Sequence, residues 1–189
     1  MGLDMYVTKA VKPNINASNV YELETLERQY TCFAATEDGT IPEDKKDLTP
    51  FLVKVHCLAA YYDMDKIAKA YNLPNDISCA GIGLNSILFI GGNGDNQKSI
   101  SITHKELKNY TCKKEKIFYI TKLDDVAYWR KEYALDDALS EYFLKARNII
   151  IENGGFYKLT KAAIKIIEQY DKRCIAFDEM SNLFYHNSY

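Results

Sequence analysis

The stretch from Asp124 to about Ile151 constrains the fold more than any other part of the chain, because it contains the only tryptophan and the longest run with helical periodicity. At a step of 100° per residue, a broad apolar stripe forms along one side of a helix over this range. We therefore predict a long central helix that ends at Asn153-Gly154-Gly155, since glycine is the usual left-handed residue after a helix. The stripe consists of Tyr128, Leu135, Leu139, Tyr142, Phe143, Ala146, Ile149 and Ile150.

The other side of this predicted helix combines aromatic and charged side chains. Tryptophan, tyrosine and arginine are enriched where a few residues carry most of the energy of a protein interface. One interpretation is therefore a binding surface for a partner, formed by Trp129, Arg130, Tyr133 and Asp137. The alternative, which we favour, is that another part of the chain covers this side, because a helix with apolar groups on opposite faces is usually sandwiched.

The second interpretation predicts a specific contact between the start of the chain and the predicted helix. Arg130 needs an acidic partner if the chain covers it, and Asp4 lies on the first predicted strand. We expect Asp4 and Arg130 to form a structural ion pair that is buried or half-buried. Loss of Arg130 would then leave a carboxylate unpaired and cost on the order of 3–5 kcal/mol of stability.

Alternation of apolar and polar residues predicts strands, because successive side chains of a strand point to opposite faces. Two short apolar runs on either side of Gly91–Asp95 predict a β-hairpin, since glycine and asparagine supply the positive φ angles of a tight connection. Together these patterns predict five strands. They span Leu3–Val11, Phe51–Ala60, Ile87–Ile90, Ser99–Ile102 and Lys116–Thr121.

Helical spacing and capping residues predict the remaining elements. Thr103 and Glu106 form a capping box, and Thr160 is placed to cap the last helix. The prediction is an α+β fold in which an antiparallel-rich sheet of about five strands packs against the long central helix and a C-terminal helix. The other predicted helices span Ser18–Tyr30, Asp63–Leu73, Lys105–Tyr110 and Lys161–Lys172.

The length of 189 residues predicts one α+β domain over residues 1–189, since a domain usually contains roughly 100–200 residues. Residues 36–49 are polar and rich in turn formers, and we predict a mobile loop there. The end of the chain from Cys174 is weakly patterned. Its apolar residues are expected to pack on the core, and they are Ile175, Phe177, Leu183, Phe184 and Tyr185.

Composition excludes several classes of protein. The chain has 24 basic and 26 acidic side chains, which makes generic nucleic-acid binding unlikely. Five widely spaced cysteines without a CxxC pair favour neither a disulfide framework nor a zinc site, and fit a reducing compartment. No apolar run approaches the ~20 residues of a membrane helix, so we expect no membrane association and a cytoplasmic protein. The oligomeric state is left open.

Motifs that would identify a reaction are missing from the sequence. The three histidines, His56, His104 and His186, are far apart and predict no metal site. His56 and Cys57 are adjacent on a predicted strand, so they point to opposite faces and do not form a catalytic dyad. The glycines at Gly91–Asp95 precede neither a Gly-Lys-Ser/Thr motif nor a helix start. We therefore predict no catalytic residue, no metal and no cofactor, and consider an enzyme the less favoured class.

Three segments have distinctive sequences, namely Met1–Val7, with the letters MGLDMYV, Val126–Lys131, with VAYWRK, and Phe156–Thr160, which leads into the last helix. They resemble segments of a group of small, uncharacterised bacteriophage and prophage proteins. The resemblance covers about a third of the chain and none of residues 31–115. The helix of that group often continues with a histidine and a Trp-Phe pair, where this chain has Asp136-Asp137 and Tyr142-Phe143. The resemblance implies a phage-type accessory protein.

Two functions from different classes follow. The first is an accessory protein that binds a host protein non-covalently, with counter-defence as its role. The second is a small-molecule or nucleotide-binding protein, or an enzyme, with a pocket beside Trp129.

Overall fold

The computed structural model describes residues 2–74, 76–171 and 182–188. The chain divides into two compact units, a large one of Met1–Cys57 with Lys116–Tyr189 and a small one of Leu58–Glu115. Two strands, β4 (Val53–Tyr62) and β8 (Thr111–Arg130), run through the boundary between them. The prediction of one domain over residues 1–189 stays a prediction.

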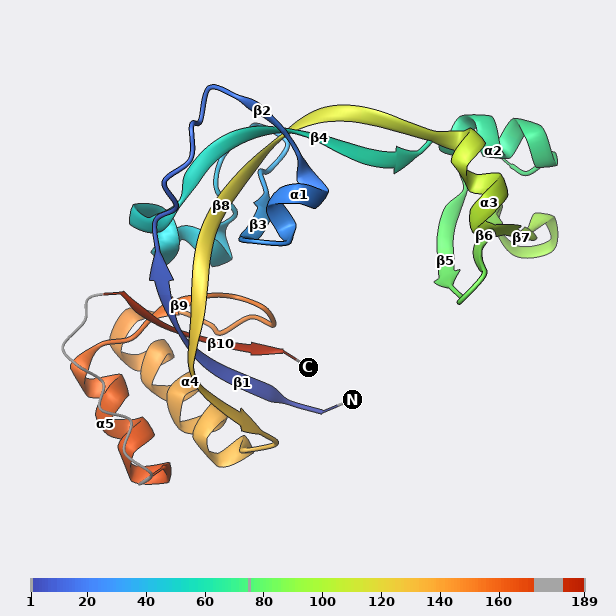
Figure 1. Ribbon diagram of the computed structural model, residues 1–189. Helices are drawn as coiled ribbons and strands as arrows, with labels where there is room; N and C mark the ends of the chain where they lie inside the picture. Colours follow the sequence, from blue (N-terminus) through green and yellow to red (C-terminus); the bar gives the residue numbers. More distant parts are fainter. Residues whose placement is uncertain (1, 75, 172–181, 189) are drawn as a thin grey trace. The chain divides into compact units, whose positions relative to one another are not determined.

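The large unit is built on strands that are far apart in the sequence. Among the described residues, seven strands form one sheet in the order β2-β4-β8-β1-β10-β9, with β3 paired to β8. Strand β1 pairs antiparallel with both β8 and β10, and β3 pairs antiparallel with β8 (Figure 1). The remaining strands are β1 (Asp4–Val11), β2 (Val20–Glu22), β3 (Thr31–Ala34), β9 (Tyr157–Lys158) and β10 (Leu183–Ser188).

Helices α4 (Tyr133–Arg147) and α5 (Lys161–Tyr170) pack against each other and cover one face of strands β1, β8 and β10 (Figure 1). Because side chains alternate along a strand, Met5 and Val7 of β1 both enter this core. We call this face of the three strands the covered face. The core between this face and the two helices includes Leu3, Met5, Val7, Trp129, Leu135, Leu139, Phe143, Ile167, Leu183 and Tyr185.

A second core lies on the opposite face of the same sheet. The 3-10 helix η1 (Glu43–Phe51) contributes Leu48, which is fully buried beside Ala10 and Phe184. The short helix α1 (Leu23–Glu27) buries Leu26. Consequently the sheet has apolar packing on both faces, and the predicted packing of Leu183, Phe184 and Tyr185 on the core is confirmed. Ile175 and Phe177 lie outside the described residues.

The small unit contains a three-stranded antiparallel sheet within its described residues, in the order β5-β6-β7. The predicted hairpin is confirmed as β6 and β7. Gly92 in its connection has a φ of 82°, and a Cβ there would lie 2.5 Å from the Asn96 carbonyl oxygen, so the position requires glycine. The predicted capping box at Thr103 is present as well. The elements are α2 (Met64–Tyr71), β5 (Ser78–Ile82), β6 (Ser86–Gly91), η2 (Gly94–Asn96), β7 (Lys98–Thr103), α3 (His104–Leu107) and η3 (Lys108–Tyr110).

The long central helix predicted from Asp124 to Ile151 is wrong. Residues up to Arg130 belong to β8, and the helix begins only at Tyr133, after Lys131 with a φ of 59°. Asp124–Arg130 pairs with β1, and this pairing satisfies the backbone of the segment, buries Trp129 and partly buries Ala127. This seven-residue stretch has one valine and two aromatic residues and fits both the helical and the strand period, so its pairing with β1 decides which one forms.

Other local predictions have mixed outcomes. The C-terminal helix is confirmed as α5, and the Thr160 side chain accepts a hydrogen bond from Ala163 N at 3.2 Å. The helix predicted over Ser18–Tyr30 is shorter than expected, because β2 occupies its start. In the segment predicted as a mobile loop, Thr36 and Thr40 close a turn and η1 begins at Glu43, while its mobility stays a prediction. Among the described residues, no helix has the length and apolarity required to cross a membrane.

Candidate functional site

Trp129, predicted to be part of a binding surface, lies on the covered face. Its side chain is 7% exposed and packs with Met5, Leu135 and other residues beneath α4 and α5. The indole Nε1 donates a hydrogen bond to Asp171 Oδ2 at 2.8 Å. The helical assignment placed Tyr128 in the core and Trp129 opposite to it, and the strand reverses these positions, because Tyr128 is 50% exposed.

Asp4, Tyr6, Tyr128 and Arg130 come together on the other face of β1 and β8, and we call these four residues the tyrosine surface. Tyr6 pairs with Tyr128 in the β1–β8 register, and Asp4 pairs with Arg130. The Tyr128 hydroxyl donates a hydrogen bond to Asp4 Oδ1 at 2.6 Å, which raises the pKa of Tyr128 above its ordinary value. The rings of Tyr6 and Tyr128 lie 5.0 Å apart. The surface therefore holds its aromatic side chains in fixed positions.

The contact expected between Asp4 and Arg130 is present in a loose form. Arg130 Nε lies 3.9 Å from Asp4 Oδ1, and the side chains are 68% and 35% exposed. Solvent screens a pair of this kind, so it contributes only about 0–1 kcal/mol to the free energy of unfolding. This is well below the loss of stability expected if the pair were buried.

Tyr133 and Asp137, the other two residues predicted to bind a partner, are both exposed on α4. They are four residues apart, so they lie on the same side of the helix. Between them, Leu135 and Asp136 are buried, and Asp136 accepts a hydrogen bond from Asn187 Nδ2 at 3.0 Å and another from the Tyr185 hydroxyl. The helix thus separates a buried polar contact from an exposed tyrosine.

The tyrosine surface continues into a row of aromatic rings. The imidazole of His186 stacks on Tyr6 at 4.6 Å with an interplanar angle of 8°, and on Phe156 at 4.5 Å. Phe33 contacts Phe156 edge-on. Burial between the rings lowers the pKa of His186 to about 4, against an opposing effect of Asp125. Sequence reasoning missed Tyr6 and His186, because only the pairing of β1 with β10 brings them together.

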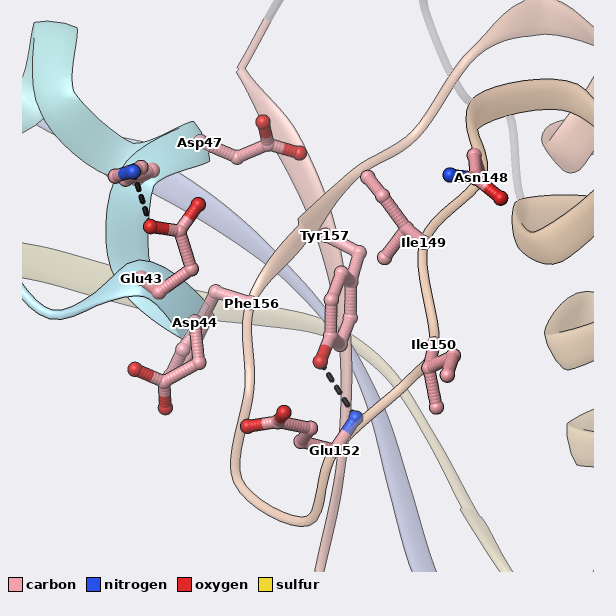
Figure 2. A pocket seen from close by; sticks show the side chains of 10 residues that line it. Glu43, Asp44, Asp47, Asn148, Ile149, Ile150, Glu152, Phe156 and Tyr157 are labelled. Carbon is pink, nitrogen blue, oxygen red and sulfur yellow. Dashed lines mark hydrogen bonds and ion pairs between the residues drawn. The ribbon is translucent and has the colours of Figure 1, made fainter.

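A cavity of about 460 Å³ opens at the far end of this row, beside Phe156 (Figure 2). One wall comes from η1, and the other comes from the segment between α4 and β9. Figure 2 shows the ring of Tyr157 in its centre, with carboxylates on one side and isoleucines on the other. The lining residues are Glu43, Asp44, Lys46, Asp47, Asn148, Ile149, Ile150, Glu152, Phe156 and Tyr157.

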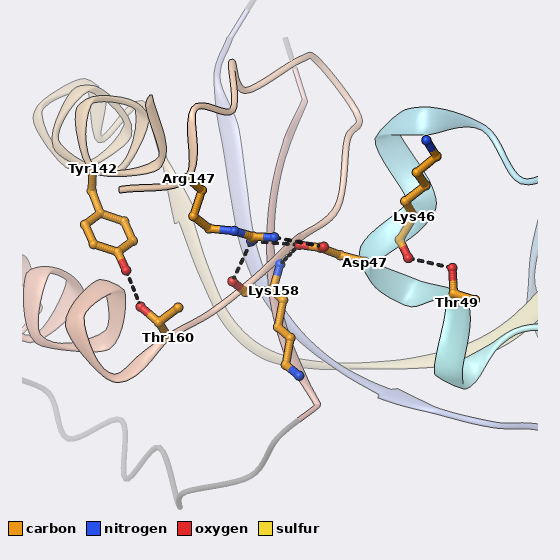
Figure 3. A network of polar contacts seen from close by, with 7 residues as sticks. All are labelled: Lys46, Asp47, Thr49, Tyr142, Arg147, Lys158 and Thr160. Atoms are coloured by element: carbon orange, nitrogen blue, oxygen red, sulfur yellow. Dashed lines mark hydrogen bonds and ion pairs between the residues drawn. The ribbon is translucent and has the colours of Figure 1, made fainter. Parts of the chain in front are cut away.

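Asp47 fixes the two walls of the cavity to each other (Figure 3). Its carboxylate accepts hydrogen bonds from Arg147 Nη1 at 2.8 Å, from Arg147 Nη2 at 3.0 Å and from Lys158 N at 2.8 Å. Partial burial alone would raise the pKa of Asp47, but the hydrogen bonds from Arg147 and Lys158 outweigh it and lower the pKa. A bidentate arginine–carboxylate pair of this kind sets the geometry of the cavity before any ligand enters.

Lys45, near the start of η1, joins this element to the loop that precedes β9. Its ammonium group donates to Asp44 Oδ2 at 2.6 Å and to the carbonyl oxygen of Gly154, and lies 5.1 Å from the centroid of the Phe156 ring. The loop between Glu152 and Phe156 is therefore tied to η1 through both charge and ring contacts. The predicted pocket beside Trp129 differs in place from this cavity, because Trp129 does not line it.

Within the described ranges, no group of three or more histidine, cysteine, aspartate or glutamate side chains is placed to hold a metal ion. The chain matches no protein-family model, no curated protein and no solved structure.

Proposed function

We propose that the chain is a phage-type accessory protein that acts by non-covalent binding to a host protein, and that the partner docks on the tyrosine surface. The observation that supports this proposal is that Tyr128 is exposed and yet held in place. Half of its side chain is exposed, yet its hydroxyl is bonded to Asp4 and its ring packs on Tyr6.

A tyrosine held in this way loses little conformational entropy when a partner covers it. Ordering a flexible side chain at an interface costs about 0.5–1.5 kcal/mol, and the contacts of Tyr128 have already fixed its rotamer. Arg130 adds a planar cation at the edge of the same surface. Tyrosine and arginine are the residue types that most often supply anchors in protein interfaces.

The phage-type role and its use in counter-defence rest on the sequence resemblance. Two of the three segments that carry it, Met1–Val7 and Val126–Lys131, are 120 residues apart in the chain. In the structure they are paired neighbours on β1 and β8, and together they supply all four residues of the tyrosine surface. These two segments of the resemblance therefore form one continuous surface in the fold. This supports the proposal that the surface has a binding role that the chain shares with the phage proteins.

Capture experiments with matched variants test the proposal. The tagged chain is incubated with a bacterial lysate, captured proteins are identified by mass spectrometry, and the best candidate is purified for direct binding. We expect Tyr128→Ala to weaken this binding by at least about tenfold, or about 1.4 kcal/mol. Tyr170→Ala is the control, since Tyr170 is 45% exposed on α5 and outside the tyrosine surface. Equal binding by both variants would exclude the tyrosine surface.

A second candidate function is small-molecule binding, and the cavity beside Phe156 favours it. Its volume falls within the range of about 300–1,000 Å³ that ligand pockets occupy. A screen of metabolites by thermal shift tests this candidate, with Ile149→Trp as the variant that fills the cavity. A ligand of this cavity should raise the melting temperature of the original chain and leave that of the variant unchanged.

A further inference from the structure

The cavity beside Phe156 has one acidic group that the protein itself does not neutralise. Three of its four carboxylates have basic partners, since Glu43 pairs with Lys46, Asp44 with Lys45 and Asp47 with Arg147. Within the part of the chain that the structure describes, the Glu152 carboxylate has no ion pair. The cavity is therefore complementary to a ligand with a single positive charge.

The position of Glu152 is fixed although its side chain is exposed. Its backbone N–H donates a hydrogen bond to the Tyr157 hydroxyl at 2.6 Å, and the next turn of the loop is held by Lys45 at Gly154. Tyr157 itself is 5% exposed, which makes it a rigid support. The carboxylate consequently stands at the mouth of the cavity on an anchored backbone, below the Tyr157 ring in Figure 2.

The other residues that line the cavity suit a planar cation attached to an apolar chain. Ile149 and Ile150 form one side of the cavity, and Ile150 is 75% exposed, although isoleucine is usually buried. Tyr157 adds an aromatic ring in the centre of the lining, and a guanidinium group stacks favourably on such a ring. Asn148, at the left-handed end of α4, adds a side-chain amide that makes no hydrogen bond to the described residues, and its oxygen can accept one.

We propose that this cavity receives an arginine side chain of the bound partner protein, an inference that rests on the proposed function. The guanidinium pairs with the Glu152 carboxylate, and its methylene stem lies along Ile149 and Ile150. Arginine fits better than lysine, because its planar fork bonds a carboxylate through two parallel N–H groups and stacks on aromatic rings. Arginine is also enriched in protein interfaces, from which lysine is depleted.

Blocked amino acids test the site directly in the full chain. Nα-acetyl-arginine amide is titrated while backbone amide signals are followed by NMR, and we expect saturable shifts at Glu152 and its neighbours. Nα-acetyl-citrulline amide has nearly the same shape without the charge and is expected to give no saturable shift. Nα-acetyl-lysine amide is expected to bind several-fold more weakly. An absent response to the arginine probe, or an equal response to the citrulline probe, would overturn the inference.

Two variants that each remove one negative charge test whether the arginine probe binds at Glu152. Glu152→Gln is expected to raise the dissociation constant of the arginine probe at least about tenfold. Glu168→Gln removes an exposed carboxylate on α5, away from the cavity, and is expected to leave it unchanged. Equal losses in both variants mean that only the net charge matters, which overturns a specific site. Saturable binding of n-butylguanidine without binding of the arginine probe identifies a small-molecule site and also overturns the inference.

Binding to the purified partner separates this inference from the proposed function. If Tyr128→Ala weakens binding and Glu152→Gln does not, the arginine site is refuted and the proposed function stands. If neither variant weakens it, the proposed function fails. Binding of the arginine probe by a chain that has no protein partner makes the cavity a site for free guanidinium ligands, and the inference then fails as well.

Discussion

The two faces of strands β1, β8 and β10 use the same backbone in different ways. On the covered face, Trp129 and Tyr185 are enclosed by α4 and α5, and their polar atoms bond to Asp171 and Asp136. On the other face, Tyr128 and its neighbours are held mainly by contacts with one another, while solvent reaches them. Neighbouring residues of one strand are therefore buried on one face and exposed on the other, and single substitutions can separate their contributions to stability from the binding role proposed for the tyrosine surface.

The largest expected difference between the faces is at Trp129 and Tyr128. Trp129→Ala removes a large buried side chain and should lower the free energy of unfolding by about 3–5 kcal/mol. Tyr128→Ala, one residue earlier and half exposed, should lower it by less than about 1.5 kcal/mol. Urea unfolding followed by circular dichroism measures both. Similar values for the two variants would show that the faces are not distinct in stability.

The next largest change in the free energy of unfolding is expected from the polar contacts of the covered face. Asp136→Ala removes the acceptor of the Tyr185 hydroxyl and of Asn187 Nδ2, and should cost about 2–3 kcal/mol because buried donors lose a partner. Asp136→Asn keeps one acceptor oxygen and should cost less. The matched variant Asp137→Ala changes an exposed carboxylate on the same helix. Its unfolding free energy should stay within about 0.5 kcal/mol of the original.

His186 should make stability depend on pH. Its pKa is about 4 in the folded protein, below its ordinary value of 6.5, so the unfolded chain binds the proton more readily. The stabilisation from neutral His186 is thus complete above pH 6.5 and is lost as the pH falls towards 4. We expect a loss on the order of 1–2 kcal/mol, which His186→Phe removes. His104→Gln, on an exposed histidine, should keep the original slope between pH 4.5 and 6.5.

The smallest effect is expected at the exposed ion pair. Arg130→Ala should change the free energy of unfolding by less than about 1 kcal/mol, and the change should shrink as salt is added. Thermal melts at low and high ionic strength measure it. A loss of 3 kcal/mol or more, independent of salt, would mean that Arg130 and Asp4 act as a buried pair.

Much of the fold could be predicted where the sequence pattern is local. The alternation in β1, the glycine-rich turn before β7 and the Thr160 cap of α5 each depend on a few adjacent residues. Residues 124–130 could not be assigned in the same way. Their aromatic and charged residues suit a helix and a strand equally, and only the pairing with β1, more than 100 residues away, decides.

The candidate site shows the same limit. The contact between Asp4 and Arg130 could be predicted from charge, but the period assumed for residues 124–130 placed Trp129 on the wrong side. The cavity could not be predicted at all. It joins Glu43–Asp47 to the segment 148–157, about 100 residues later, and the bond between Asp47 and Arg147 that holds them together has no signature in either segment.

The burial of Trp129 also gives the protein an optical property. A single indole, enclosed and bonded to Asp171, dominates the emission of the chain when it is excited selectively. Its spectrum reports on the packing of α4 and α5 against the sheet, and it should shift to longer wavelength on unfolding. A ligand that binds the other face should leave the emission maximum in place, so fluorescence can follow folding while a separate signal follows association.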